Sequence, residues 1–197
     1  MIIEAALEEF AEKGYAGASM AATAARAGIA KGLIYHYFPG KAELFRAVIR
    51  SCVQTAFAEA EGLIAGYEGP RTVLISVLID QAYARISRER RERILFKLLL
   101  VEAERFPELA ELYRTEVLAR AIRLIGAILR SGVAAGEFRP GAADPGLPEV
   151  LLAPAVMAAI WQMMLGEADA PSLEAMRRAH AALVLRGLAA AAGPDGG

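Results

Sequence analysis

Four side chains near the N-terminus have the chemistry and spacing to contact nucleic acid: Lys31, Tyr35, His36 and Tyr37. A lysine can reach guanine O6 and N7 or a phosphate. These residues follow Gly28, a residue type that ends helices because it adopts a left-handed backbone without a Cβ penalty. Two short helices joined by such a turn form a helix-turn-helix, whose second helix enters the DNA major groove. Ala-rich helix pairs with a glycine turn also occur in other all-α proteins, so the flanking residues must decide.

The flanking residues predict further helices that pack against this pair. Apolar residues at helical spacing run from Ile3 to Ala11, and Gly14 ends this first helix. Ser19 can cap the next helix by accepting a hydrogen bond from a backbone amide. A fourth helix begins at Lys41. We therefore expect about fifty residues to form a compact three-helix unit and the start of a long helix.

This ordered pattern resembles the DNA-binding domain of the TetR/AcrR family of bacterial transcriptional regulators. The resemblance is carried by Ile3–Tyr15 and Gly28–Phe45, and it covers residues 2 to about 50. The remaining three quarters of the chain resemble the family only in being helical and apolar. The resemblance implies a DNA-binding regulator, in most cases a repressor.

The resemblance also implies which residues contact DNA. Ser19 and Met20, at the start of the second helix, would approach the phosphate backbone. Tyr35 and His36 would contact phosphates and thymine methyl groups, and Tyr37, where the family often has His, could still reach a phosphate. The full set of expected contacts is Ser19, Met20, Lys31, Gly32, Leu33, Tyr35, His36, Tyr37 and Lys41.

Lys31, Gly32 and Leu33 are expected at the exposed tip of the recognition helix. Gly32 would allow close backbone approach, and Leu33 would read DNA by apolar contact, for instance with a thymine methyl. Lys41 would bind a phosphate at the start of the fourth helix. The alternatives are that Tyr35 is a core aromatic and that the two lysines are solvated surface charges.

Several positions depart from the family pattern. Ala30 stands where Ser or Thr usually caps the recognition helix, a loss of about 1 kcal/mol. Ala22 removes the acidic residue that would complete a capping box with Ser19, and Thr23 replaces Ile, so its hydroxyl is expected to face the small core. The basic stretch that often precedes the first helix is absent before Ile3. We expect a looser DNA-binding unit than most.

Composition limits the other functions. The 197 residues have a formal net charge of −1, which argues against a globally basic coat protein for nucleic acid but allows a local basic patch. Within residues 1–50 the acids gather in the first helix and the bases in the next three, so the DNA face is expected to be positive. The single cysteine, Cys52, is expected to be a small buried hydrophobe and fits a reducing cytoplasm. One Cys and two His argue against a metal site, and no cofactor is expected.

The rest of the chain has no strand pattern and predicts an all-α fold of about nine helices. The expected helices after the third are 41–65, 70–86, 88–104, 107–135, 148–165 and 172–191. The expected domains are a helix-turn-helix DNA-binding domain at 1–48, a helical ligand-binding and dimerisation domain at 49–192, and a disordered tail at 193–197.

The last two helices are rich in Ala, Leu, Met and Val. The family resemblance implies that they form a four-helix bundle with a second copy; the alternative is an ordinary monomer core. A homodimer would present two recognition helices to a palindromic operator on double-stranded DNA. The uncharged stretch Val150–Gly166 is shorter than about 20 residues and contains Pro154 and Gln162, so it is interpreted as an interface helix rather than a membrane span. Glu4 and Glu8 argue against a signal peptide.

By the same resemblance, the middle helices would hold a small apolar effector. The candidate lining residues are Tyr83, Phe96, Leu99, Leu100, Tyr113, Met157, Trp161 and Met164. Taken singly, each is better explained as ordinary core. Glu102, Glu104 or Arg105 could meet a charged ligand group, but nothing in the sequence singles them out. No Ser/His/Asp set or carboxylate pair indicates an enzyme. The prediction is a cytoplasmic repressor released from DNA by its ligand. The alternative is a ligand-binding or interaction protein of the same fold with weak or lost specific DNA binding.

Overall fold

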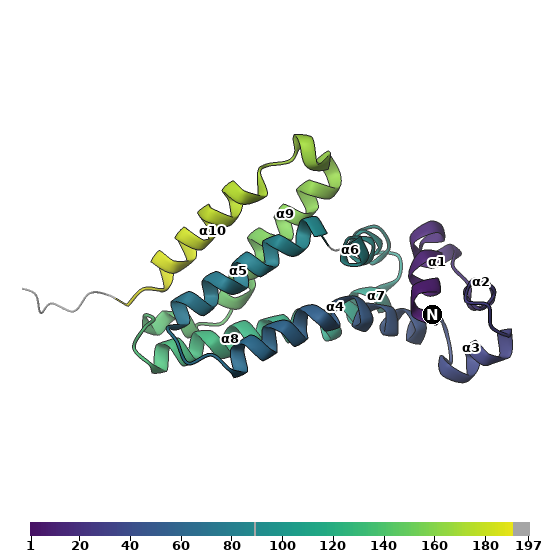
Figure 1. The fold of residues 1–197 in the computed structure, drawn as a ribbon, viewed down its shortest axis with the longest axis horizontal. Coiled ribbons are helices and arrows are strands. Elements are labelled where there is room, and N and C mark those ends of the chain that lie inside the picture. The colour runs from purple at the N-terminus through teal and green to yellow at the C-terminus, as the bar shows by residue number, and fades with distance from the viewer. Residues whose placement is uncertain (89, 191–197) are drawn as a thin grey trace, which may run out of the picture. The chain divides into compact units, whose positions relative to one another are not determined.

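The computed structural model describes residues 1–88 and 90–190, and this part of the chain is almost entirely helical (Figure 1). The helices are α1 (Ile2–Gly17), α2 (Met20–Arg26), α3 (Lys31–Tyr37), α4 (Lys41–Ala65), α5 (Arg71–Arg88), α6 (Arg90–Glu102), α7 (Pro107–Tyr113), α8 (Ala119–Ala134), α9 (Leu147–Asp169) and α10 (Leu173–Leu188). A π-helical turn, Arg114–Leu118, joins α7 to α8, and a 3₁₀ turn spans Pro140–Ala143. The predicted all-α class is confirmed.

The helix boundaries lie close to those expected. Because the π-helical turn makes α7 and α8 one continuous run, the single predicted helix 107–135 corresponds to both, and about nine helices is the right number for the described residues. Helix α4 has the predicted bounds. Helix α9 extends to Asp169, beyond the predicted end at Leu165, but Gly166 interrupts it with a φ of +78°. The expected tail at 193–197 lies outside the described residues.

The first of two compact units, unit one, consists of Met1–Ala58 and Glu89–Arg120. Helix α1 packs against α2 and α6. The core of unit one centres on aromatic rings, with Phe45 5.0 Å from Phe10 and 5.3 Å from Tyr15 between ring centroids, and Phe106 5.0 Å from Tyr15. The aromatic cluster holds the first helix against residues more than eighty positions later in the chain.

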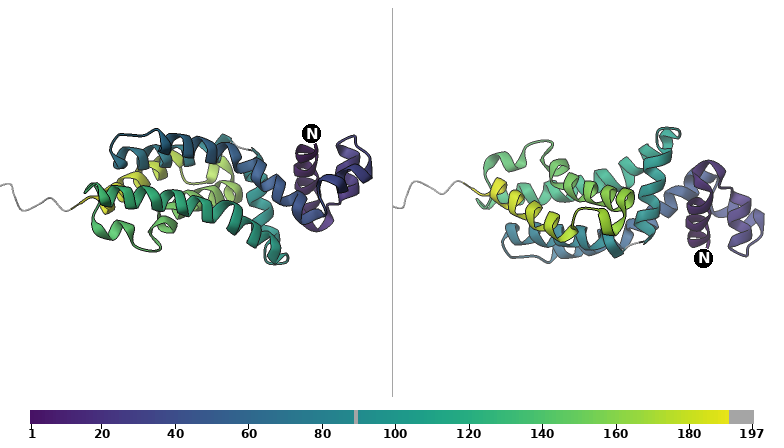
Figure 2. Two further views of the ribbon diagram at one scale, coloured as in Figure 1. Left: turned by 90° about the horizontal axis from the view of Figure 1, so that it is seen from below. Right: turned by 90° about the horizontal axis from the view of Figure 1, so that it is seen from above.

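The second unit, unit two, comprises Glu59–Arg88 and the described residues of Ala121–Gly197. Helices α5, α9 and α10 pack on one another, as the two views of Figure 2 also show. Leu74, Ile128, Leu129 and Leu188 are among its fully buried side chains. Packing therefore places α6 and α7 in the same unit as the helix-turn-helix. The boundary expected after residue 48 divides the sequence by function instead, and it stays a prediction.

Candidate nucleic-acid interface

Helices α2 and α3 form a helix-turn-helix whose turn depends on Gly28. This residue has a φ of +67°, in the left-handed region that favours glycine. The amide of Ile29 then donates to the carbonyl of Ala24 at 3.0 Å. Ile34 of α3 is completely buried in the core of unit one. The glycine turn and this buried side chain together hold α3 against α2.

The capping of α2 and α3 follows the prediction. The Ser19 hydroxyl accepts a hydrogen bond from the Ala22 amide at 3.1 Å. Thr23 is buried, and its hydroxyl donates to the Ser19 carbonyl at 3.0 Å, so the polar group expected in the small core has a partner. Ala30 supplies no side-chain cap to α3. The recognition helix thus begins without the capping bond that its neighbour has.

Three large side chains of α3 are exposed. Leu33, Tyr35 and Tyr37 retain 41%, 46% and 59% of their surface. Lys31 and His36 are exposed as well, and the His36 ring lies edge-on to Tyr37 with 5.5 Å between centroids. This exposure rules out the alternative that Tyr35 is a core aromatic. Together the exposed side chains of α3 offer a cation, hydroxyls and apolar surface, the groups that contact phosphates and base edges.

Gly32 and Met20 stand in opposite environments. A Cβ at Gly32 would meet no atom within 4 Å, so packing within the described chain does not require glycine there. Met20 retains only 6% of its surface and belongs to the core. The Met20 side chain is therefore not available to DNA, and only its backbone at the start of α2 can approach a phosphate.

Lys41 makes contacts that the sequence did not reveal. Its Nζ donates to the carbonyls of Tyr15, Ala18 and Ala16, at 2.6, 3.2 and 3.3 Å. It also lies 4.6 Å from the centre of the Tyr15 ring. These carbonyls follow Gly14, where the backbone of α1 leaves helical geometry and its last carbonyls lack helical partners. Lys41 therefore stabilises the end of α1, and a phosphate would have to share its ammonium group with these carbonyls.

Arginines assigned from the sequence to a positive DNA face are paired with acids. Arg26 donates to both oxygens of Glu12, at 2.9 and 2.6 Å, and these bonds lower the pKa of Glu12. Arg46 donates to Glu43 at 3.2 Å. Lys31 has no hydrogen bond or ion pair within the described part of the chain. The positive charge that Arg26 and Arg46 offer to DNA is therefore smaller than the residue count suggested, whereas the charge of Lys31 on α3 is not paired within the described residues.

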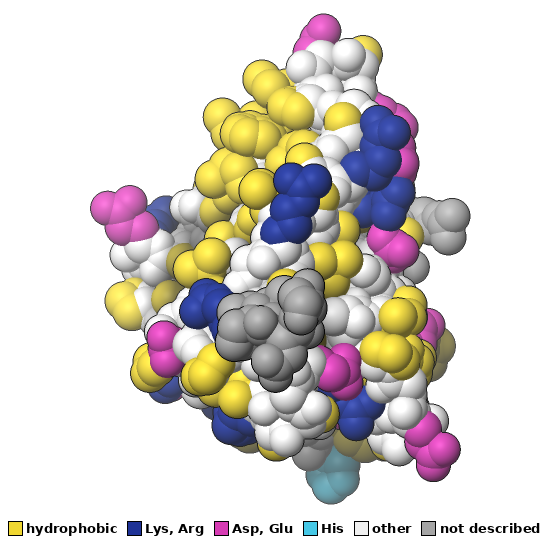
Figure 3. Space-filling model, turned by 90° about the vertical axis from the view of Figure 1, so that its left-hand side faces the viewer, with side chains coloured by type: hydrophobic (Ala, Val, Ile, Leu, Met, Phe, Trp, Pro, Cys, Tyr) yellow, Lys and Arg dark blue, Asp and Glu magenta, His cyan; other side chains and the backbone are white. Residues whose placement is uncertain are grey.

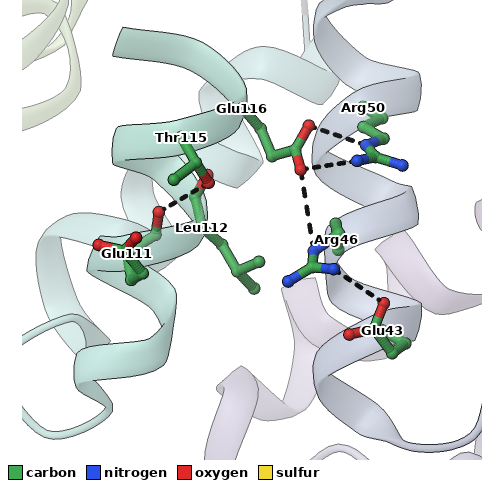
Figure 4. Close-up of polar contacts among 7 residues, drawn as sticks. All are labelled: Glu43, Arg46, Arg50, Glu111, Leu112, Thr115 and Glu116. Carbon is green, nitrogen blue, oxygen red and sulfur yellow. Dashed lines mark hydrogen bonds and ion pairs between the residues drawn. The ribbon is translucent and has the colours of Figure 1, made fainter. Parts of the chain in front are cut away.

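The π-helical turn is linked to α4 through Glu116 (Figure 4). The carboxylate accepts from Nε and Nη2 of Arg50, at 2.8 and 2.9 Å, and Arg46 Nε lies 3.8 Å away. The hydrogen bonds from Arg50 lower the pKa of Glu116. Since Arg46 also contacts Glu43, a chain of charges connects the π-helical turn to the first turns of α4, directly after the recognition helix. π-Helical turns of this kind occur frequently at functional sites.

The eight candidate effector residues are divided between the two units. Phe96 and Tyr113 lie together in unit one, with 6.4 Å between ring centroids. Leu99 is buried in the core of the same unit, whereas Leu100 is 53% exposed. Tyr83 is buried in unit two. The remaining three candidates, Met157, Trp161 and Met164, are exposed on α9.

These three side chains belong to an exposed apolar stripe on α9. With Val150 they recur at intervals of seven, four and three residues, the spacing of one helical face. Figure 3 shows hydrophobic side chains gathered on one side of this view. Helix α9 is also the one described helix that is long and apolar enough to cross a membrane, judged by length and composition. We call Val150, Met157, Trp161 and Met164 the α9 face.

Cys52 is buried on α4, and burial raises the pKa of its thiol to about 11. The expectation of a small buried hydrophobe is confirmed. Among residues 1–88 and 90–190, no group of three His, Cys, Asp or Glu side chains is placed to hold a metal ion.

Two matches to known families cover most of the chain. Residues 2–48 match the family described as bacterial regulatory proteins, tetR family. Residues 77–179, more than half of the chain, match the tetracyclin repressor-like C-terminal domain. The chain belongs to the TetR family. As a TetR-family protein it is a transcriptional regulator, and α1–α3 lie within the segment that matches the tetR family of regulatory proteins.

Relatives and solved structures agree with this family. The uncharacterized HTH-type transcriptional regulator YvdT of Bacillus subtilis (strain 168) is 34% identical over 82 residues, 42% of each chain, so the match spans less than half of that relative. The regulator FadR of Bacillus subtilis, solved with stearoyl-CoA, has a TM-score of 0.75 at 22% identity, over 95% of this chain and 97% of FadR. A regulator from Saccharomonospora viridis, solved with choline, has a TM-score of 0.72 at 21% identity, over 95% of both chains. At these identities the two structures show the shared fold.

Sequence reasoning missed three contacts in this TetR-family chain. Besides the carbonyls at Lys41, it missed Glu102, whose carboxylate accepts from the Tyr15 amide at 3.0 Å and so is occupied inside unit one. It also missed His180, which is buried beside Tyr83 with 5.8 Å between ring centroids. The apolar spacing of α10 could have indicated that His180 is buried, but no sequence signal indicates its neighbour.

Proposed function

We propose that the protein is a cytoplasmic, non-enzymatic repressor that binds a palindromic operator and leaves it when an apolar small molecule binds. The observation that carries this proposal is the set of exposed side chains on α3, Lys31, Leu33, Tyr35, His36 and Tyr37, while Ile34 alone anchors the helix in the core. In the proposed complex, α3 lies in the major groove. The contacts are the side chains of Ser19, Lys31, Leu33, Tyr35, His36, Tyr37 and Lys41, and the backbone of Met20 and Gly32.

The α9 face supports the proposal of a homodimer through the last two helices. Its apolar side chains are exposed in the single chain, and packing against a second copy would remove them from water. A twofold dimer presents two recognition helices to two half-sites, which is the geometry that a palindrome requires. If the α9 face were inserted in a membrane instead, it could not pair with a second copy, and the two recognition helices would not be brought together on a palindrome.

The proposed effector acts by population shift. A ligand that binds one conformation of the regulator more tightly favours that conformation, and the operator favours the other. The stearoyl-CoA and choline complexes of similarly folded regulators support a small-molecule ligand. Glu116 and Arg50 could transmit the conformational change within unit one. Their hydrogen bonds join the π-helical turn to α4, so a shift of the turn would also move α4, which follows the recognition helix.

Selection of bound duplexes from a random DNA pool tests the proposal. We expect one palindromic sequence to be enriched, two protomers to bind each duplex, and lipophilic compounds to release the protein from it. Lys31→Ala and Leu33→Ala should change the preferred bases, whereas Lys41→Ala should weaken all sequences and reduce the salt dependence. Equal effects of all three variants on every sequence would contradict this division of roles.

The second candidate function is a ligand-binding protein of the same fold without specific DNA binding. Two features favour it. The paired arginines have less charge available for phosphates, and the missing side-chain cap makes α3 less stable, so both features lower the expected affinity for a duplex. Enrichment of no sequence in the selection, together with ligand binding, would decide for this alternative.

A further inference from the structure

Two polar side chains in the interior of unit two lie next to each other without hydrogen-bond partners. Tyr83 of α5 and His180 of α10 expose 3% and 6% of their surface, and their ring centroids are 5.8 Å apart with 59° between the planes. Among the described residues, none hydrogen-bonds to the Tyr83 hydroxyl or to either ring nitrogen of His180. Buried polar atoms are rarely left unpaired, because they give up their bonds to water without replacement.

The surroundings of this pair are apolar. Tyr83 belongs to a core cluster that includes Leu151, Ala155 and Ala158 of α9. Burial raises the pKa of Tyr83 and lowers the pKa of His180, and the backbone of Leu151 partly opposes the latter effect. Both groups are therefore neutral near pH 7.

The nearest turn of the same two helices supplies no free charge. Asp80 of α5 and Arg177 of α10 form an ion pair with each other, and Arg177 also pairs with Glu174. An ionised ligand group placed between Tyr83 and His180 would thus find no counter-ion in these contacts, and burying an unpaired ion is strongly unfavourable.

The two neutral groups complement a hydroxyl. A neutral imidazole has one donor and one acceptor nitrogen, and a phenol both donates and accepts. An alcohol can donate to the imidazole acceptor and accept from the phenol, which pairs atoms that are now unpaired. We propose that Tyr83 and His180 bind the hydroxyl group of an otherwise apolar ligand between α5, α9 and α10. This assignment rests on the proposed effector function and names the polar group that the effector carries.

A comparison of alcohols with their methyl ethers tests the assignment. Dodecanol, geraniol and benzyl alcohol, each with its ether, and dodecanoate are titrated into the full chain by calorimetry, and His180 is followed by nitrogen NMR of its ring. We expect at least one alcohol to bind about tenfold more tightly than its ether, with a shift of the His180 ring signals. Ethers that bind as well as alcohols, binding of no alcohol, or tighter binding of dodecanoate would each overturn the assignment.

Conservative substitutions of Tyr83 and His180 test whether these two residues cause the preference for the alcohol. Tyr83→Phe should reduce the affinity for the alcohol to that for the ether, and His180→Gln should weaken the alcohol selectively. Tyr67→Phe, the same change at another tyrosine of unit two, is the matched control and should leave both affinities unchanged. Without ligand, Tyr83→Phe should keep or raise the melting temperature, because it removes an unpaired polar atom. A clear loss of stability would show that the hydroxyl is already paired, for example by a buried water, and would overturn the proposal.

The outcome is separable from that of the repressor proposal. The calorimetry uses no DNA, so the alcohol and ether affinities decide the ligand class whether or not the protein selects an operator. Conversely, unliganded Tyr83→Phe should bind a selected operator as the unaltered protein does. Failure of operator selection would remove the repressor function and leave the alcohol result standing.

Discussion

The helix-turn-helix and the interior of unit two differ in whether their polar side chains have hydrogen-bond partners. Around α1–α4, Ser19, Thr23, Lys41 and Arg26 all have partners within the chain. Between α5 and α10, a phenol and an imidazole are buried without any. The first pattern stabilises the position of α3 and leaves its exposed side chains for a partner. The second leaves hydrogen-bonding capacity inside the protein, where a small molecule rather than DNA can use it.

Replacing Lys41 should have the largest effect on stability. Lys41→Met keeps much of the aliphatic chain but removes the ammonium that three carbonyls accept from, so we expect a loss of about 2 kcal/mol in the free energy of unfolding, measured by urea denaturation. Lys31→Met is the control, because Lys31 is exposed on α3, and it should change stability by less than about 0.5 kcal/mol. Similar small losses in both variants would show that the helix-turn-helix does not depend on its paired polar groups.

The caps of α2 and α3 should respond in opposite directions. Ser19→Ala removes the acceptor for the Ala22 amide and should destabilise the protein by about 1 kcal/mol. Ala30→Ser adds a cap where α3 has none and should stabilise it by a similar amount. Thermal unfolding of the two variants measures both changes. A loss in Ala30→Ser would mean that the start of α3 cannot accept a cap.

The buried imidazole should make stability dependent on pH. Because burial lowers the pKa of His180, the unfolded chain takes up a proton more readily than the folded one. This contribution is fully present above the ordinary pKa of 6.5 and is lost as the pH falls below it, by at most about 1.4 kcal/mol at pH 5.5. His180→Leu should flatten this part of the profile of unfolding free energy against pH. An unchanged slope would show that His180 gains a proton inside the fold.

Glu116 should show the smallest effect. Arg50 holds the pKa of this carboxyl below its usual 4.5, so the ionised carboxylate stabilises the fold above that pH and loses the effect as the pH falls through the lowered pKa. Arg50 is largely exposed, so Glu116→Gln should lower stability at pH 7 by only about 0.5 kcal/mol. The difference from the unaltered protein should vanish at low pH. The informative readout is release from DNA by ligand, which the variant should weaken if the π-helical turn signals through α4.

Local patterns in the sequence predicted the local features well. Gly28, the Ser19 cap, the uncapped Ala30 and the bounds of α4 all follow from neighbours within a few residues. The contacts of Lys41 with α1 and of His180 with α5 join residues far apart in the chain, and spacing carries no information about them. Apolar periodicity also cannot tell a buried stripe from an exposed one, which is why Met157 and Leu99 were grouped although one is exposed and the other buried.

The most direct test of the account is the affinity for a selected palindrome compared with a scrambled duplex of the same composition, measured by fluorescence anisotropy at physiological salt. We expect the unaltered protein to prefer the palindrome by about a thousandfold or more. We also expect Leu33→Ala to lose much of this preference while both duplexes still bind. Equal affinity for the two duplexes, unaffected by Leu33→Ala, would contradict the assignment of α3 as an operator-reading helix.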